Sequence, residues 1–345
     1  MAAHPEMRFS VDPWDPSYGT NLDASEGQSP HRVDVGVELP ASGWRPLHAE
    51  PAARPTSATL FVDGVRRIDA QAWIHDPDGP DASPALYVSY AAGVMCCCPD
   101  DGAHLAAHRI RRGLVTTAAH AVDVHTSAGR YAATVVAPDP SRPPGQDLSL
   151  VVQGLLNTVE VEAAADARAT LEMDDDLLVV DGPLRGRQNL PRTIGYVKTH
   201  HKAYLQPAEN AVVAALGPGE RTPVFRLVTS WERFTWYLRL PGTPGAPWAG
   251  IVRLECSPNL DVADAVALAR RSQVMLPRYA SAGYKDSRAP QNLYPIAGLE
   301  RCLRRRLGDQ AVVYRGLRAA AGRPIETAAA RLMDTAAAGR PMVLV

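Results

Sequence analysis

The chain has 345 residues, of which 46% are hydrophobic, so it can bury a substantial core in one elaborated domain or in two domains. Its formal net charge is −1, which excludes an overall positive field, and any nucleic-acid-binding surface must therefore be local. No apolar run approaches the length of a membrane span and no signal-like segment begins the chain, so we expect a soluble, cytoplasmic protein that does not enter a membrane.

The five cysteines include three consecutive ones at 96–98. Successive residues of a strand point to opposite faces, so these three cannot all join one tetrahedral metal site, and the chain has no CxxC pair. We therefore expect free thiols in a reducing compartment, and no metal held by sulfur.

The first 55 residues have little regular pattern. Within them, the segment 7–16 is interrupted by proline and has two large apolar residues, Phe9 and Trp14. We expect an extended N-terminal arm, which either packs on its own domain or embraces a second subunit.

Strands dominate the next part of the chain. Residues 57–75 predict a strand that stops at Asp63, a tight turn through Asp63-Gly64, and a second strand. Segments 85–98 and 104–117 continue the pattern with short connections, which predicts an antiparallel meander, and 130–136 is a candidate for one more strand.

A helix is predicted over 147–171, because apolar residues recur there at steps of three and four. Asp147 is a candidate N-cap for this helix. Glu160 and Glu162 lie within its apolar stripe, so one of them is expected to point toward the strand that follows.

Alternating elements fill the remainder. We expect strands at 177–181, 193–197, 222–229, 233–240 and 248–256, and helices at 209–216, 261–275 and 295–307. A strand meander, then a helix, then alternating strands and helices is the order of an RNase H-like α/β fold, which has a mixed sheet flanked by helices.

Two apolar runs end in aspartate: 59–62 leads to Asp63, and 177–180 leads to Asp181. Two carboxylates brought to one edge of a sheet suit a hard divalent cation such as Mg²⁺ or Mn²⁺. Hydrolysis of a phosphodiester by two metal ions needs three or four carboxylates, and a glutamate of the 147–171 helix is the expected third. Lys198 ends the next strand, where its ammonium group could stabilise charge on a scissile phosphate.

Basic residues follow both strands that end at this expected site. Such groups would supply the local contacts to DNA phosphates that the net charge does not provide. The candidates are Arg185 and Arg187 after Asp181, and His200, His201 and Lys202 after Lys198.

With these motifs in order, the chain resembles the NurA nuclease family. The resemblance rests on Val-Asp-Gly at 62–64, Leu-Val-Val-Asp-Gly-Pro-Leu at 178–184, Ile-Gly-Tyr-Val-Lys at 194–198 and Leu-Tyr-Pro at 293–295. It implies an RNase H-like nuclease domain, which we place at 56–320 between the arm at 1–55 and a C-terminal tail at 321–345.

The resemblance also implies an activity and partners. The expected activity is Mn²⁺- or Mg²⁺-dependent cleavage of single-stranded DNA and DNA ends. The expected assembly is a homodimer docked on a HerA-type hexameric ATPase that translocates DNA, in end resection for DNA repair or in antiphage defence.

By position, the resemblance assigns Asp63 and Asp181 as metal ligands and Lys198 as the active-site lysine. The helix glutamate of the family maps to Glu160 or Glu162, and we favour Glu160.

The chain departs from the family pattern on the last helix. The family often has a histidine there, whereas this chain has Glu300, a weaker candidate ligand, and Arg301, a candidate DNA contact. This departure motivates an alternative function, a catalytically attenuated subunit that caps or regulates a DNA translocase.

Overall fold

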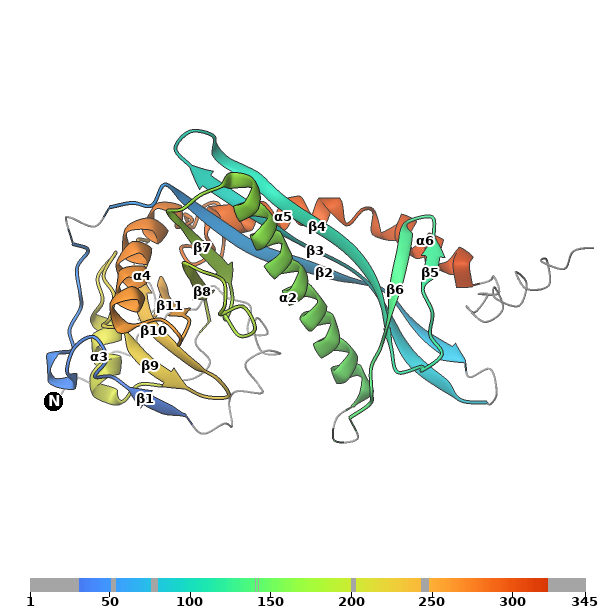
Figure 1. The fold of residues 1–345 in the computed structure, drawn as a ribbon, viewed down its shortest axis with the longest axis horizontal. Helices are drawn as coiled ribbons and strands as arrows, with labels where there is room; N and C mark the ends of the chain where they lie inside the picture. The colour runs from blue at the N-terminus through green and yellow to red at the C-terminus, as the bar shows by residue number, and fades with distance from the viewer. Residues whose placement is uncertain are drawn as a thin grey trace, which may run out of the picture. The chain divides into compact units, whose positions relative to one another are not determined.

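The computed structural model has a mixed α/β fold, with a large mixed sheet flanked by helices (Figure 1). This confirms the predicted α/β class. In the part of the chain that the structure describes, no helix is both long and apolar enough to cross a membrane. The described residues are 31–50, 54–75, 80–139, 141, 143–199, 203–242 and 248–321.

The described residues fall into two compact units. The first unit draws on Met1–Asp63, Gly93–Ala107 and Ala163–Glu300, and the second on Gly64–Ala92, His108–Glu162 and Arg301–Val345. Three long strands contribute residues to both units: β2 (Ala58–His75), β3 (Ala82–Cys98) and β4 (Gly102–Thr116).

The first unit contains the parallel part of the sheet. Strand β7 (Asp176–Asp181) lies between β2 and β8 (Thr193–Val197) and runs parallel to both. On the far side of β8 the order continues through antiparallel pairs with β11 (Ile251–Cys256), β10 (Glu232–Arg239), β9 (Phe225–Val228) and β1 (Arg32–Asp34).

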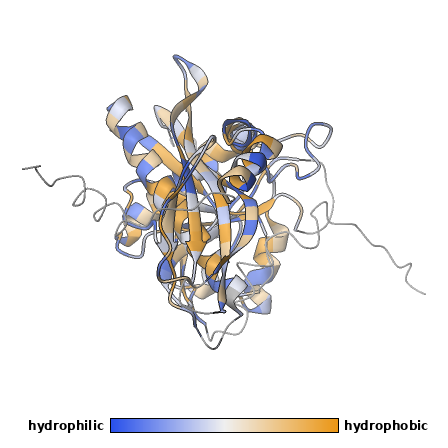
Figure 2. Cartoon of the chain, turned by 90° about the vertical axis from the view of Figure 1, so that its right-hand side faces the viewer, coloured by the Kyte–Doolittle hydropathy of each residue, from blue (hydrophilic) through white to orange (hydrophobic). Residues whose placement is uncertain are grey.

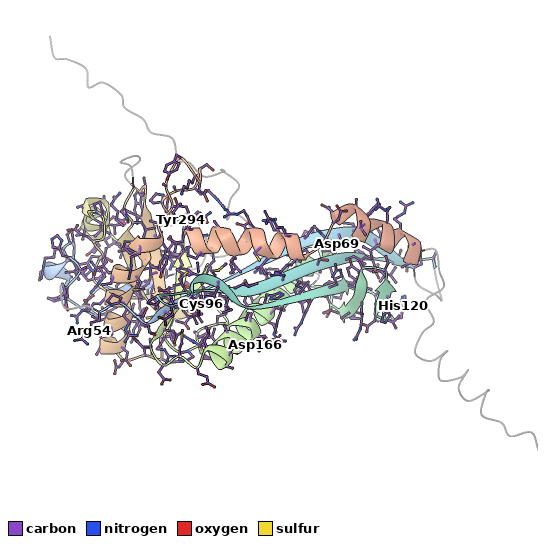
Figure 3. All side chains as sticks on the ribbon, turned by 90° about the horizontal axis from the view of Figure 1, so that it is seen from above. Arg54, Asp69, Cys96, His120, Asp166 and Tyr294 are labelled. Carbon is purple, nitrogen blue, oxygen red and sulfur yellow. The ribbon has the colours of Figure 1, made fainter. Side chains whose placement is uncertain are left out.

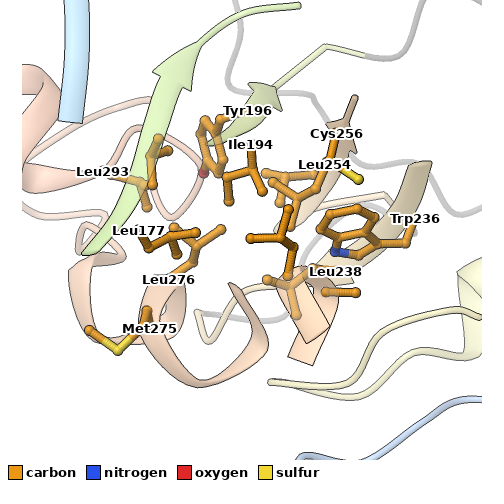
Figure 4. Close-up of a cluster of buried hydrophobic side chains, with 14 of the residues drawn as sticks. Leu177, Ile194, Tyr196, Trp236, Leu238, Leu254, Cys256, Met275, Leu276 and Leu293 are labelled. Carbon is orange, nitrogen blue, oxygen red and sulfur yellow. The ribbon is translucent and has the colours of Figure 1, made fainter. Parts of the chain in front are cut away.

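Mostly apolar sequences explain why β7 and β8 lie inside this unit. All five residues of β8 are buried, as are the first five of β7, because parallel strands are normally covered on both faces. Figure 4 shows the cluster that they form with Trp236, Leu254 and Leu276.

Helix α4 (Val262–Met275) packs against this cluster, and as predicted Asp261 begins it, since its carboxylate accepts a hydrogen bond from the Asp264 N–H at 2.7 Å. The remaining short elements of the first unit are η1 (Ala41–Gly43), α3 (Pro207–Ala215) and η2 (Leu276–Tyr279).

In the second unit, β4 is joined by β6 (Gly129–Val135), which runs parallel to it, and β6 pairs with β5 (Val124–Thr126). The additional strand predicted at 130–136 is thus confirmed as β6, and it runs parallel to β4. The helices α2 (Pro144–Leu171) and α5 (Tyr294–Arg306) have residues in both units, and α6 (Gln310–Ala321) lies in the second. In Figure 2 the strands are mostly hydrophobic in colour and the helices alternate, as expected for helices with one buried stripe.

A buried carboxylate organises the second unit. Asp69 on β2 accepts hydrogen bonds from Arg67 Nε at 2.8 Å, Ser89 Oγ at 2.5 Å and Tyr131 Oη at 2.9 Å. Arg67 also donates to the backbone carbonyl of Gly308 at 2.7 Å, just beyond the end of α5. This bond places a cation just after the C-terminal end of α5, where positive charge suits the negative end of the helix dipole.

The turn predicted at Asp63-Gly64 is wrong. Strand β2 continues through both residues for 18 residues, and Gly64 lies within it. Glycine is needed for close approach instead: a Cβ at Gly64 would lie 2.7 Å from Glu160 Oε1 and 2.7 Å from Leu156 Cδ1 of α2. Asp-Gly is common turn chemistry, but here tertiary packing on α2 decided the conformation.

The N-cap predicted at Asp147 is also wrong. Helix α2 begins at Pro144, so Asp147 lies in its first turn. Asp147 is buried there and accepts a hydrogen bond from the Asp139 N–H at 3.0 Å, which secures the loop before the helix. Proline is tolerated in the first turn of a helix because the N–H that it lacks would have no partner there, so α2 can begin at Pro144.

We expect Gly64→Ala to destabilise the protein by about 1–3 kcal/mol, because the new methyl group overlaps Glu160 and Leu156. Urea denaturation measures the change. The matched control is Gly154→Ala in the interior of α2, where a Cβ meets no atom within 4 Å. That variant should gain up to about 1 kcal/mol, as alanine replaces glycine in a helix. Equal effects of the two substitutions would contradict the close packing at Gly64.

Candidate active site around Asp181 and Lys198

Asp63 and Asp181 lie on adjacent parallel strands in the first unit. The register of the two strands pairs Val62 of β2 with Val180 of β7, so the next residue on each strand is an aspartate. Side chains at the same position of parallel neighbours share a face, and their Cα atoms are about 4.8 Å apart. Asp181 ends β7, as predicted, whereas Asp63 lies inside β2 rather than at a strand end.

Lys198 forms an ion pair with Asp181. Its Nζ lies 2.7 Å from Asp181 Oδ2, and the lysine side chain is only 4% exposed while that of the aspartate is 18% exposed. Lys198 comes directly after β8, whose residue Tyr196 is opposite Asp181 in the register. A buried ammonium group needs such a partner, so the pair fixes both side chains at the carboxyl ends of β7 and β8.

A second acidic residue is connected to Lys198 through Asn292. Asn292 Oδ1 accepts a hydrogen bond from Lys198 Nζ at 3.3 Å, and its Nδ2 donates to Asp286 Oδ2 at 2.6 Å. Burial opposes ionisation of Asp286, but the hydrogen bonds from Asn292 and from the Arg288 N–H, with the charge of Arg288, outweigh it and lower the pKa of Asp286. Sequence reasoning missed this chain, although Asn292 directly precedes the Leu-Tyr-Pro segment.

The loop after Asp181 is held rigidly at its start. Gly182 has a φ of +93° and exchanges two backbone hydrogen bonds with Tyr196. The Leu184 N–H then donates to Glu255 Oε1 at 2.6 Å. Glu255 is fully buried, and its other oxygen lies 3.1 Å from Arg233 Nε and 3.0 Å from Arg253 Nη1.

The two arginines predicted to bind DNA in this loop differ in exposure. Arg185 is exposed to solvent, whereas Arg187 is only 7% exposed. The Arg187 N–H donates to the Leu184 carbonyl at 2.7 Å, which closes a tight turn around the exposed pair Arg185-Gly186. Arg185 is therefore the one available for a phosphate contact without rearrangement.

The two glutamates left open by the sequence are in different surroundings within the second unit. Glu162 is partly exposed and pairs with Arg111 at 2.6 Å and with Arg109 at 3.4 Å. Glu160 is 5% exposed, and its carboxylate lies against Gly64, the residue after Asp63 in β2. The geometry thus distinguishes a surface ion pair from a buried carboxylate, and the buried one is Glu160.

The remaining candidates are divided between described and undescribed residues. Glu300 Oε2 lies 3.6 Å from Arg288 Nη2, and Arg301 is exposed. His200, His201 and Lys202 lie outside the described residues.

No three carboxylates among the described residues lie within 4.8 Å of one another. The group of three potential metal ligands that does is Cys96, Cys98 and His104 of β3 and β4, which sequence reasoning missed. The structure therefore does not gather the three carboxylates expected from the sequence: the two aspartates lie on neighbouring strands, and Lys198 is paired with Asp181.

No protein-family model and no curated protein matches this chain. Fold and site together define an α/β protein with two aspartates on adjacent parallel strands, a buried lysine directly after the next strand and an exposed arginine in the loop after Asp181. Such a set can bind a divalent cation by oxygen and offer positive charge to an anionic substrate.

We expect Asn292→Ala to destabilise the protein by about 1–3 kcal/mol at pH 7, because the fully buried amide serves both Lys198 and Asp286. A carboxyl group with a lowered pKa stabilises the fold above its unfolded-state pKa, and this stabilisation disappears as the pH falls through the folded-state pKa. Loss of the amide weakens that effect, so the difference from the parent should be largest at neutral pH and should narrow below the ordinary pKa of 3.8.

Urea denaturation at several pH values measures this difference. Asn259→Ala is the control, on an exposed asparagine whose backbone N–H, unchanged by the substitution, donates to Ser257 Oγ. A difference that is constant with pH would show that Asn292 does not act on Asp286.

Proposed function

We propose that the protein is a divalent-metal-dependent nuclease that cleaves single-stranded DNA and DNA ends. One observation carries the proposal: the parallel register sets Asp63 beside Asp181, and Lys198 is bonded to Asp181 at 2.7 Å. Carboxylates on neighbouring strands are suited to binding divalent cations, and the lysine beside them is suited to the negative charge of a phosphodiester.

The order of strands supports an RNase H-like sheet. In the order β8-β7-β2-β3-β4, the strand that contains the first aspartate, β2, is central, and it has parallel partners on one side and the hairpin β3–β4 on the other. This is the arrangement that the sequence order predicts for such a fold.

The donor set fits Mg²⁺ or Mn²⁺, because Asp63 and Asp181 offer oxygen ligands, which these hard ions prefer. Glu160 is the proposed third ligand on the basis of the sequence. When bound, the ion would polarise the phosphoryl group and lower the pKa of an attacking water. Lys198 holds the Asp181 carboxylate in place and supplies positive charge for the phosphate oxygens, while Arg185 contacts the DNA backbone.

The assembly remains part of the proposal and rests on the NurA resemblance. We propose a homodimer that acts with a HerA-type hexameric ATPase in DNA end processing or antiphage defence. Arg301, exposed on α5, is proposed as a further contact to DNA.

The test is cleavage of single-stranded and linear duplex DNA by the purified protein in Mn²⁺ or Mg²⁺, with and without the ATPase. We expect cleavage that a chelator abolishes and that Asp63→Asn removes. Cleavage that persists in the chelator, or in the Asp63→Asn variant, would contradict the proposed site.

A catalytically attenuated subunit is the second candidate. Its supporting observation is that Asp181 is already paired with Lys198, and Glu300 lies near Arg288 where the family often has a histidine. A complex that binds the ATPase tightly but cleaves neither DNA nor RNA in any divalent ion would favour this function over the nuclease.

A further inference from the structure

Three metal-ligating side chains meet at the closed end of the β3–β4 hairpin, within the first unit. The Sγ atoms of Cys96 and Cys98 and a ring nitrogen of His104 all lie within 4.8 Å of one another. Cys96, on β3 (Figure 3), is buried, and the other two are partly buried. The oxygen-ligand site proposed above shares none of these residues.

The hairpin itself explains the meeting. Strand β3 ends at Cys98 and β4 begins at Gly102, so residues 99–101 form the turn and Asp100 is its centre. Residues at equal distances along the chain from Asp100 are expected to face each other, which sets Cys98 opposite Gly102 and Cys96 opposite His104. Cys98 Sγ indeed lies 4.0 Å from the Gly102 carbonyl. Cys96 and Cys98 share a face because side chains alternate along a strand, and Cys97 points to the other face, toward the core cluster of the first unit.

His104 provides an independent observation. Its Nδ1 atom is buried and has no hydrogen-bond partner among the described residues. A buried polar atom normally has a partner, and leaving one without costs about 1–3 kcal/mol. A histidine that places one ring nitrogen within 4.8 Å of two thiols and has a buried Nδ1 without a partner is suited to binding a metal ion.

We propose that Cys96, Cys98 and His104 form a binding site for a borderline-soft divalent cation, Zn²⁺ foremost. Two thiolates and one imidazole are three ligands that Zn²⁺ prefers, and water completes a tetrahedron. The ligand atoms of such a site, at bond lengths of about 2.0–2.3 Å, lie roughly 3.8 Å apart. The three groups therefore need to close by only about 1 Å, and both thiols release their protons to solvent as the metal–sulfur bonds form.

The site would clamp the end of the hairpin. Residues of this hairpin end, Cys97 and Cys98 among them, line a cavity of about 600 Å³. A clamp at the turn would therefore also fix one wall of that cavity.

The test uses the full-length protein, stripped with a chelator, reloaded with Zn²⁺ alone and dialysed. We expect one zinc ion per chain by elemental analysis, and a raised Tm, since the ion binds the folded state. Cys96→Ser and His104→Ala should each lose the zinc and the Tm shift. Cys97→Ser, on the same strand but the other face, should keep both.

Replacing Zn²⁺ by Co²⁺ gives a second readout, because thiolate ligands produce a charge-transfer absorption band. The band should be absent in His104→Ala and Cys96→Ser, and circular dichroism checks that both variants fold. A parent protein that retains no zinc, or equal loss in Cys97→Ser, would overturn the proposal. Neither result depends on DNA cleavage, so this proposal and the nuclease can fail separately.

Discussion

Asp181→Asn should reduce metal-dependent DNA cleavage by on the order of a hundredfold to a thousandfold. A metal ion supplies several kcal/mol of transition-state stabilisation, and each 1.36 kcal/mol is worth a factor of about ten in rate. The amide of the variant is a poor ligand for Mg²⁺ or Mn²⁺. Its oxygen can still accept the hydrogen bond that Lys198 Nζ donates to Asp181 Oδ2, at 2.7 Å, in the parent protein. The variant should therefore fold while losing activity in single-turnover cleavage assays.

Asp175→Asn is the matched control for this experiment. Asp175 precedes β7, its side chain is 53% exposed, and its partner is the surface residue Arg271 at 2.8 Å. Cleavage by this variant should equal that of the parent. If Asp181→Asn also cleaves at the parental rate, Asp181 is not a metal ligand.

Asp176→Asn should produce the largest loss of stability, about 3 kcal/mol. Asp176, at the start of β7, is fully buried and accepts hydrogen bonds from Arg168 Nη2 at 2.6 Å and Arg192 Nε at 2.7 Å. Removal of one partner from a buried ion pair costs about 3–5 kcal/mol. We expect a loss at the lower end of this range because the Arg192 side chain is 34% exposed and water can solvate it. Total stability is typically 5–15 kcal/mol, so the denaturant midpoint should fall substantially.

The same Asp175→Asn variant serves as the control for stability. An exposed ion pair contributes at most about 1 kcal/mol, so its denaturation curve should nearly overlay that of the parent. The two ends of one strand would then have separable roles, since Asp176 sets stability and Asp181 sets cleavage. Similar stability losses for Asp175→Asn and Asp176→Asn would contradict the assigned burial.

The elements nearest the candidate site could be predicted because their pattern is local. The runs at 177–181 and 193–197 are short, apolar and bounded by polar residues, and both form buried parallel strands. The helix predicted at 147–171 forms with a start three residues earlier. The helix α6 was missed, although its buried residues Val313 and Leu317 are spaced by four and could have revealed it.

Long-range contacts explain what the sequence could not predict. Asp63-Gly64 has the composition of a turn, and only contact with Leu156 and Glu160, far along the chain, shows why a strand continues through it. The bridge from Lys198 through Asn292 to Asp286 likewise joins segments about ninety residues apart. In contrast, the closeness of Cys96 and His104 could have been predicted from the sequence, because both residues lie four positions from Asp100 at the centre of a short hairpin turn.

The hydrogen bonds that hold the 182–187 loop predict where this part of the chain tolerates insertions. Backbone pairing at Gly182, the bond from Leu184 to Glu255 and the turn closed by Arg187 leave only Arg185 and Gly186 exposed between fixed points. Insertions between these two residues would lengthen a surface tip and leave the strands in register. Insertions one or two residues earlier would detach Leu184 from its buried acceptor, so a transposon scan should find a sharp border of tolerance at this position.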